Sequence, residues 1–243
     1  MKNIVLAAGY ATRMYPLTEN FPKPLLKIGE KTILDRLMED IDTFEEVEEH
    51  IVVTNHKFAH IFEEWRAGSH YSKPIRIIDD GSMDNEHRIG AVKDLLLALK
   101  DESGDDAYLV VAADNMLDFS LRGFVDYYKE KGTSLIMCHH EESIPALQRT
   151  GVVCLNETNK VLLMEEKPKE PKSHWAVPPF YIYAPQDMPL IKHCIENGCG
   201  YDAPGNLAHY LCEKSTMHAW EMPGSRLDIG NLEIYERLCK ETK

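Results

Sequence analysis

Short apolar runs alternate with amphipathic stretches along the first 140 residues. The run NIVLAA at 3–8 ends at Gly9 and predicts a buried strand that leads into a loop. Residues 32–41 carry apolar side chains at helical spacing, which predicts an amphipathic helix capped by Thr32. The alternation continues with strands at 50–54, 75–78, 108–113 and 133–138 and helices at 58–65, 91–99 and 121–130. This order predicts a mostly parallel sheet with right-handed crossovers.

The pattern changes after residue 140. Residues 151–168 are typical of two strands joined by a polar turn at 156–159, and a strand at 180–185 precedes a helix over 187–198. No linker separates the two parts. We therefore expect one domain over residues 1–243, of the α/β class. It has a Rossmann-like, mostly parallel mixed sheet flanked by helices in the half 1–140 and a small α+β lobe in the half 141–243.

Composition narrows the possible partners. With 243 residues, 44% hydrophobic and 28% charged, the chain has the composition of an ordinary globular protein. Its 27 basic and 40 acidic residues give a net charge of −13, so the average surface repels nucleic acid. A polyanionic ligand must therefore bind through a local group of bases or through a metal.

Cysteine usage and hydropathy indicate the cellular compartment. The six cysteines contain no C-x-x-C pair, and the apolar stretch in MKNIVLAAGY is too short for a signal peptide. No uncharged apolar window approaches the roughly 18–20 residues of a transmembrane helix. The sequence predicts reduced thiols, a cytoplasmic protein and no insertion into a membrane.

The segment LAAGYATRMYPLTENFPKPLL at 6–26 is the strongest candidate for chemistry. Small residues at the end of a strand let backbone N–H groups approach a phosphate chain, and Arg13 and Lys23 add two cations. The segment is neither a Walker A loop nor a G-x-G-x-x-G loop, because Ala11 and Met14 occupy the later glycine positions. By spacing alone, the segment predicts either a triphosphate-binding loop or an ordinary strand-to-helix turn with exposed basic side chains.

This segment resembles the signature of the sugar-1-phosphate nucleotidyltransferases, and three further matches follow in order. They are VAADN at 111–115, TGVV at 150–153 with MEEKPKEPKSHWAV at 164–177, and DIGNLEIYE at 228–236. The resemblance spans residues 6–236 and is strongest to the glucose-1-phosphate thymidylyltransferases. It implies an enzyme that transfers a nucleotidyl group from a nucleoside triphosphate (NTP) to a sugar-1-phosphate, releasing pyrophosphate and forming an NDP-sugar.

The resemblance also implies the residues of the nucleotide site. Arg13 is expected to contact the departing phosphates, and Lys23 to stabilise charge at the α-phosphate as the second catalytic residue. Asp114 and Asp228 are expected to hold Mg²⁺, the implied cofactor. The full set of nucleotide-binding positions is Leu6, Ala7, Ala8, Gly9, Arg13, Lys23, Gly90 and Asp114.

A second group of residues is expected to bind a small phosphorylated acceptor. By resemblance, Lys167 holds the acceptor's phosphate and Glu166 its hydroxyls. Gly151 and Arg226 complete this predicted acceptor set. The sequence leaves the oligomeric state open; because relatives often assemble, a closed homodimer is the default expectation.

Three departures from the family pattern leave the acceptor open. Ala11 replaces a loop glycine, Pro178 and Pro179 stand where relatives have a glycine, and Arg226 lies where a tryptophan is common. The two prolines remove N–H donors, which alters the acceptor pocket. The alternatives are a cytidylyltransferase acting on a phospho-alcohol such as phosphocholine, and a nucleotide-sugar-dependent glycosyltransferase. AADNM lacks the D-x-D motif usual in the latter, and a non-catalytic paralogue is expected to lose Arg13, Lys23 or an aspartate.

Overall fold

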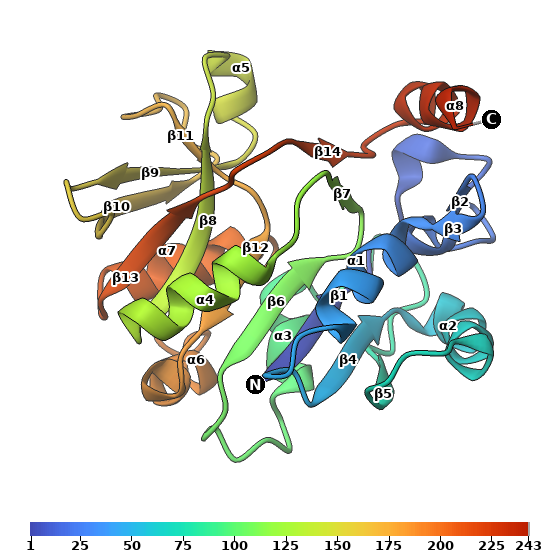
Figure 1. Cartoon of the computed structure of the whole chain (residues 1–243), viewed down its shortest axis with the longest axis horizontal. Helices are drawn as coiled ribbons and strands as arrows, with labels where there is room; N and C mark the ends of the chain where they lie inside the picture. The colour runs from blue at the N-terminus through green and yellow to red at the C-terminus, as the bar shows by residue number, and fades with distance from the viewer. Residues whose placement is uncertain (243) are drawn as a thin grey trace. The chain divides into compact units, whose positions relative to one another are not determined.

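The computed structural model describes residues 1–242, which divide into two compact units (Figure 1). The first unit comprises residues 2–89, 112–121 and 224–242. The second comprises residues 90–111 and 122–223, together with Met1. Because each unit combines separated stretches of chain, neither corresponds to the predicted halves 1–140 and 141–243. That the first half binds the nucleotide and the second half binds the acceptor stays a prediction.

A parallel sheet forms the centre of the first unit. Strands β1 (Lys2–Leu6), β4 (Glu49–Thr54) and β5 (Ile75–Asp79) pair in parallel, with Ile4 opposite Ile51 and Val52 opposite Ile77. Helices α1 (Ile33–Asp42) and α2 (His56–Gly68) connect these strands. The predicted cap is present, because Thr32 and Asp35 form a reciprocal capping box that satisfies two free N–H groups of α1.

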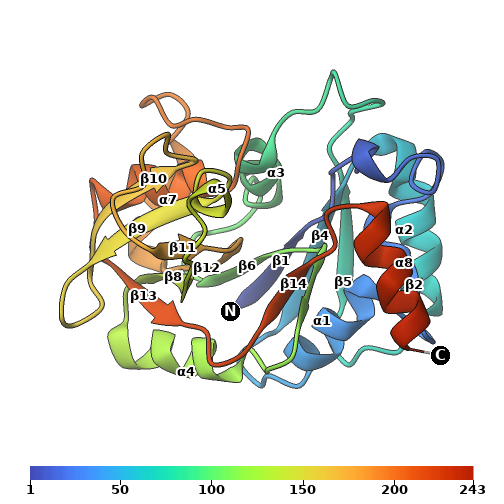
Figure 2. The same ribbon diagram turned by 90° about the horizontal axis from the view of Figure 1, so that it is seen from above.

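Short elements extend the first unit beyond this sheet. They are η1 (Thr12–Met14), η2 (Lys23–Leu25), β2 (Lys27–Ile28), β3 (Lys31–Thr32), β7 (Asn115–Leu117), β14 (Arg226–Asp228) and α8 (Leu232–Glu241). β14 pairs antiparallel with β7, and α8 lies beside β2 in both views (Figure 1, Figure 2). Met14, Ile33 and Ile229 share one buried cluster, which anchors η1 and the end of β14.

The second unit contains a larger run of strands. Their order is β10 (Val161–Glu166), β9 (Gly151–Leu155), β11 (Trp175–Val177), β8 (Ser134–His140), β12 (Phe180–Tyr183) and β6 (Tyr108–Ala112). The neighbours in this run pair antiparallel, whereas β13 (Met217–Glu221) pairs with β8 in parallel. The predicted α/β class, with a mixed sheet flanked by helices, is confirmed.

Helices cover the strands of the second unit. They are α3 (Ala91–Ala98), α4 (Arg122–Lys131), α5 (Ile144–Leu147), α6 (Met188–Lys192), which follows η3 (Pro185–Asp187), and α7 (Gly205–Cys212). α7 packs against β10, and α4 packs against β8 and β13, where the rings of Phe124 and Trp220 lie 5.5 Å apart. In residues 1–242, no helix is both long and apolar enough to span a membrane.

The predicted helix over 187–198 is shorter than expected. α6 ends at Lys192, and the chain then forms turns. In these turns Cys199 N–H donates to the Cys194 carbonyl, and Gly198 N–H donates to the Ile195 carbonyl. Gly198 has φ of +87°, the left-handed conformation that commonly ends a helix. The apolar spacing of Ile191, Cys194 and Ile195 therefore continues beyond the last residue of α6, where the chain forms turns and no longer a helix.

Candidate functional site

Lys23 lies between two aspartates of the first unit. Its ammonium Nζ is 2.8 Å from Asp114 Oδ2 and 3.8 Å from Asp228 Oδ1, and its side chain is only 9% exposed. An ammonium out of water is stable only beside opposite charge. The structure thus brings together the predicted catalytic lysine and both predicted metal ligands.

Two prolines and two leucines place Lys23. Pro22 precedes η2 and Pro24 lies within its first turn, so φ is fixed on both sides of the lysine. Leu25 and Leu26 are buried, and Leu26 N–H donates to the Lys23 carbonyl. The backbone is therefore held on the apolar side while the lysine side chain extends toward the aspartates.

The two aspartates are carried by paired segments. In the β7–β14 ladder, Asp228 lies opposite Asn115, and Ile229 N–H donates to the Asp114 carbonyl at 3.3 Å. Ala113 N–H donates to the carbonyl of Leu6 at the end of β1. Asp114 therefore lies close to the start of the predicted phosphate loop.

Several charged side chains lie close enough to Asp228 to shift its pKa. Although its side chain is 51% exposed, the pKa of Asp228 is raised, first by loss of hydration and then by the charge of Asp114. Lys23, Arg226 and Arg13 act in the opposite direction. Arg13 therefore belongs electrostatically to the same site, with an exposed side chain in the middle of η1.

The segment from Leu6 to Arg13 leaves space for a ligand. A Cβ added to Gly9 would meet nothing within 4 Å. Asn55 Nδ2 donates to the Ala8 carbonyl at 3.1 Å, and Thr18 Oγ1 donates to the Ala11 carbonyl at 2.8 Å. Side chains from outside the segment thus hold its backbone, while the position of Gly9 stays open.

Ala11 adopts the left-handed conformation, with φ of 46°. Replacing Ala11 by glycine should raise the free energy of unfolding by about 1 kcal/mol, because an L-residue with a Cβ is strained there. Urea denaturation of both proteins measures this. Ala67→Gly, at an exposed position of helix α2, is the control and should lower stability by about 1 kcal/mol. An Ala11→Gly protein as unstable as that control would contradict the interpretation.

The donor set around Lys23 fits Mg²⁺. Two carboxylates share one ammonium, and the charge of Asp114 raises the pKa of Asp228, so the two carboxylates repel each other and a hard cation would relieve this repulsion. No cluster of three or more His, Cys, Asp or Glu side chains that could hold a metal is found in residues 1–242. Phosphate and water oxygens would complete the coordination, as Mg²⁺ prefers.

In the second unit, Glu166 is packed against two glycines. Its Oε2 lies 3.3 Å from a Cβ built on Gly151 and 2.0 Å from one built on Gly205, so a side chain at Gly205 would collide with the carboxylate. The Glu166 side chain is only 14% exposed. Burial raises its pKa, and the charges of Lys167 and His209 offset this only in part.

Lys167 and Gly90 are held in unusual backbone conformations. Lys167 has φ of 50° and its N–H donates to the Thr150 carbonyl, which leaves a 52% exposed side chain with Nζ 3.8 Å from Glu166 Oε1. Gly90 precedes α3 with φ of 97°, and a Cβ there would lie 2.5 Å from the Tyr201 carbonyl oxygen. Packing therefore requires glycine at position 90, independently of the nucleotide-binding role predicted for it.

Replacing Glu166 by glutamine should stabilise the fold at pH 7. A raised pKa means that the charged form is penalised in the folded state, and this penalty exists above the folded pKa. It vanishes below the unfolded pKa of about 4.3, where both states are protonated. Denaturation at pH 7 and near pH 4 should show a gain only at pH 7. Glu165→Gln, which removes a partner of Lys172, is the control, and an equal gain there would contradict the assignment to burial.

The predicted site residues are divided between the units. Leu6 to Gly9, Arg13, Lys23, Asp114 and Asp228 lie in the first unit, and Gly90, Gly151, Glu166 and Lys167 lie in the second. Arg226, predicted with the acceptor residues, lies in the first unit with the aspartates. Sequence reasoning missed Asn115 and Gly205; the first was signalled only by its position after Asp114.

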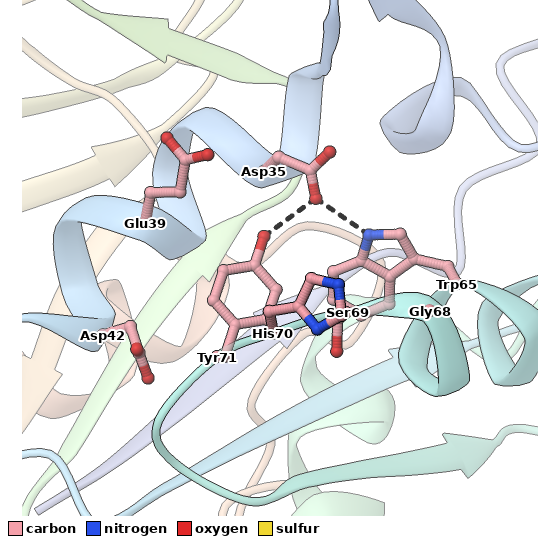
Figure 3. A pocket seen from close by; sticks show the side chains of 8 residues that line it. All are labelled: Asp35, Glu39, Asp42, Trp65, Gly68, Ser69, His70 and Tyr71. Carbon is pink, nitrogen blue, oxygen red and sulfur yellow. Dashed lines mark hydrogen bonds between the residues drawn. The ribbon is translucent and has the colours of Figure 1, made fainter.

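A separate cavity of about 400 Å³ lies between α1 and the end of α2 (Figure 3). Asp35 accepts hydrogen bonds from Trp65 Nε1 and the Tyr71 hydroxyl at 2.9 and 2.8 Å. Burial would raise the pKa of Asp35, but hydrogen bonds from Trp65, Thr32 and Tyr71 outweigh it and lower the pKa. Asp35 therefore has a structural role, because it connects α1 to Trp65 of α2 by a hydrogen bond.

Known proteins are similar to this chain over most of its length. The chain is 26% identical over 245 residues to a UTP–glucose-1-phosphate uridylyltransferase of Synechocystis sp., covering 97% of this chain but 61% of that protein. It is 26% identical over 255 residues to a uridylyltransferase of the same name from Haloferax volcanii, covering 100% and 98%. A solved UDP-glucose pyrophosphorylase complexed with UDP-glucose has a TM-score of 0.82 at 20% identity, covering 99% and 97%, which shows a shared fold.

The match to a protein family covers almost the whole chain. Residues 2–243 match the nucleotidyl transferase family, and this span contains the predicted phosphate-binding segment 6–26, both aspartates, and Glu166 with Lys167. The chain belongs to the nucleotidyl transferase family.

Proposed function

We propose that this protein transfers the nucleotidyl group of an NTP to a sugar-1-phosphate, releases pyrophosphate and forms an NDP-sugar. The observation that carries the proposal is the Lys23 ammonium between the Asp114 and Asp228 carboxylates, next to a phosphate loop at the end of β1. The family membership and the names of both relatives support the same reaction.

The chemistry follows from the charges. An oxygen of the acceptor phosphate attacks the α-phosphorus, and the bond from that phosphorus to the pyrophosphate oxygen breaks. The second pKa of a phosphate monoester is about 6, so the attacking group is already deprotonated near neutral pH and needs no general base. The main task is to neutralise and orient two anions.

Arg13 and Lys23 perform this task from the protein side. Lys23, which is held rigidly and out of water, stabilises negative charge at the α-phosphate, and exposed Arg13 binds the departing phosphates. Mg²⁺ bound by Asp114 and Asp228 would supply Lewis-acid polarisation of phosphate oxygens. Glu166 and Lys167 bind the acceptor in this proposal, through its hydroxyls and phosphate respectively.

We propose UTP as donor and glucose-1-phosphate as the first acceptor to test, because both relatives carry those names. Pro178 and Pro179 form the corner between β11 and β12, and Thr150 Oγ1 already donates to the Val177 carbonyl at 2.8 Å. These contacts leave few backbone groups at that corner for acceptor hydroxyls. Other hexose phosphates therefore belong in the panel.

A pyrophosphate-release screen tests the proposal. Four NTPs are combined with glucose-1-phosphate, other sugar-1-phosphates and phosphocholine, with Mg²⁺ present. We expect release that requires a sugar-1-phosphate, with kcat/KM above ~10⁴ M⁻¹s⁻¹ for the natural pair. Turnover of CTP with phosphocholine alone would establish the cytidylyltransferase alternative instead.

Replacing Lys167 by alanine should raise the acceptor KM or abolish turnover, because the acceptor phosphate loses its cation. NTP binding, measured by calorimetry without acceptor, should stay near that of the wild type. Lys169→Ala, two residues further along the same loop, is the control. Loss of NTP affinity in Lys167→Ala would show that this residue contacts the triphosphate.

The compartment and assembly are also proposals. All six cysteines are free thiols, which is typical of the reducing cytoplasm. A homodimer is the default assembly, and light scattering in solution measures it directly.

A further inference from the structure

The side chain of Arg226 ends on Asn115, beside the two aspartates. Its Nη1 donates to Asn115 Oδ1 at 2.6 Å. We propose that Arg226 is a positioning residue, which fixes the carboxylate of Asp114 through the amide of Asn115. This inference deepens the proposed function and rests on it for its kinetic readouts.

Asn115 has all of its hydrogen-bonding groups occupied. It is 1% exposed, and its Nδ2 donates to Asp114 Oδ1 at 2.9 Å and to the Ala112 carbonyl at 3.2 Å. An amide has two N–H donors and one carbonyl oxygen, so the bond from Arg226 completes the set. Asn115 therefore links Arg226 directly to a predicted metal ligand.

The guanidinium determines which way the amide points. Arginine is a donor only, so the atom of Asn115 that faces it must be the oxygen, and the NH₂ group must then face Asp114. Without Arg226, the amide can turn, which would bring its oxygen against a carboxylate oxygen. A buried amide oxygen without a donor also costs free energy.

The result is a carboxylate held at both oxygens. Asp114 Oδ1 accepts from Asn115 and Oδ2 from Lys23 at 2.8 Å. Arg226 and Asp228 are two residues apart on β14 and therefore lie on the same face, and Asp228 pairs with Asn115 on β7. One two-stranded ribbon thus carries the positioning pair and presents Asp228 next to Asp114.

The same contacts favour a role for Arg226 at the aspartates over the acceptor role predicted for it. Nη1 is engaged with Asn115, and Nε is buried with no hydrogen-bond partner among the described residues. The side chain also contributes to the electrostatics of Asp228. In this inference, Arg226 acts on the metal aspartates and has no direct contact with the acceptor.

The test measures metal affinity as well as turnover. Mn²⁺ binding is measured without substrates by electron paramagnetic resonance, together with the Mg²⁺ activation constant and the acceptor KM. Arg226→Met should weaken Mn²⁺ binding about 10- to 100-fold, the usual effect of losing a residue that orients a metal ligand. Asn115→Ala should do the same, and the double variant should be no worse than either, because both act through one path.

Two further variants complete the comparison. Arg226→Lys keeps one donor toward Asn115 and should recover most of the Mn²⁺ affinity. Arg237→Met, on exposed α8, is the matched control and should change nothing. If Arg226→Met does not fold, as judged by circular dichroism, Arg226→Lys and Asn115→Ala carry the test.

Each other outcome has a defined meaning. A raised acceptor KM with unchanged Mn²⁺ affinity in Arg226→Met would overturn the inference and restore the acceptor role. A wild-type protein that binds no Mn²⁺ would overturn it together with the metal site. A wild-type protein that binds Mn²⁺ but uses no sugar-1-phosphate would defeat the proposed function alone, because the Mn²⁺ comparison does not depend on turnover.

Discussion

Replacing Lys23 by alanine should lower kcat by about two to three orders of magnitude and change the KM for the NTP much less. In the proposed site, the buried Lys23 ammonium would stabilise charge that builds up at the α-phosphate in the transition state, and losses of this kind typically cost 10²- to 10³-fold. The change also leaves Asp114 and Asp228 facing each other without the cation between them. Steady-state kinetics with varied NTP separates kcat from KM.

The control is Lys27→Ala, an exposed lysine on neighbouring β2. It removes the same charge from the first unit without touching either aspartate, so its kinetics should match the wild type. A Lys23→Ala protein with unchanged kcat and a raised KM would show that Lys23 only docks the triphosphate. Arg13 would then be the better catalytic candidate.

Asp114→Asn and Asp228→Asn should each lower turnover about a thousandfold or more, and EDTA should abolish wild-type activity. Each substitution removes half of the charge offered to Mg²⁺ while keeping the side-chain volume. Assays at increasing Mg²⁺ concentration measure the effect. Circular dichroism checks that the fold is kept.

Asp126→Asn, at an exposed position of helix α4, serves as the control for these carboxylates and should retain full activity. Full wild-type activity in EDTA would contradict the metal assignment. Activity lost in Asp114→Asn but kept in Asp228→Asn would leave Asp114 as the one metal ligand of the proposed pair. It would contradict the claim that both carboxylates hold Mg²⁺.

Local pattern was sufficient for much of the fold. The apolar spacing at 32–41 and the Thr32 cap match α1, because a capping box and a buried stripe act within one segment. α7 was not predicted, since its eight residues begin after Pro204 with no side-chain cap. Packing against β10 stabilises α7, and the sequence does not show that contact directly.

The candidate site also has one part that motifs predicted and one part that they did not. Lys23, Asp114 and Asp228 were expected from motifs, and the structure places them within one cluster. The link from Arg226 to Asn115 could not be predicted, because it depends on a ladder between two three-residue strands far apart in the chain. Such short strands have no periodicity from which to infer their pairing.

The most direct test of the central claim follows the phosphorus atoms. The wild-type protein is incubated with Mg²⁺, a sugar-1-phosphate and UTP labelled with ³²P at either the α- or the γ-position. Nucleotidyl transfer predicts that the α-label enters a phosphatase-resistant NDP-sugar and the γ-label leaves entirely as pyrophosphate. Transfer of the γ-label to the acceptor, or an acceptor left unlabelled by the α-label, would contradict the account.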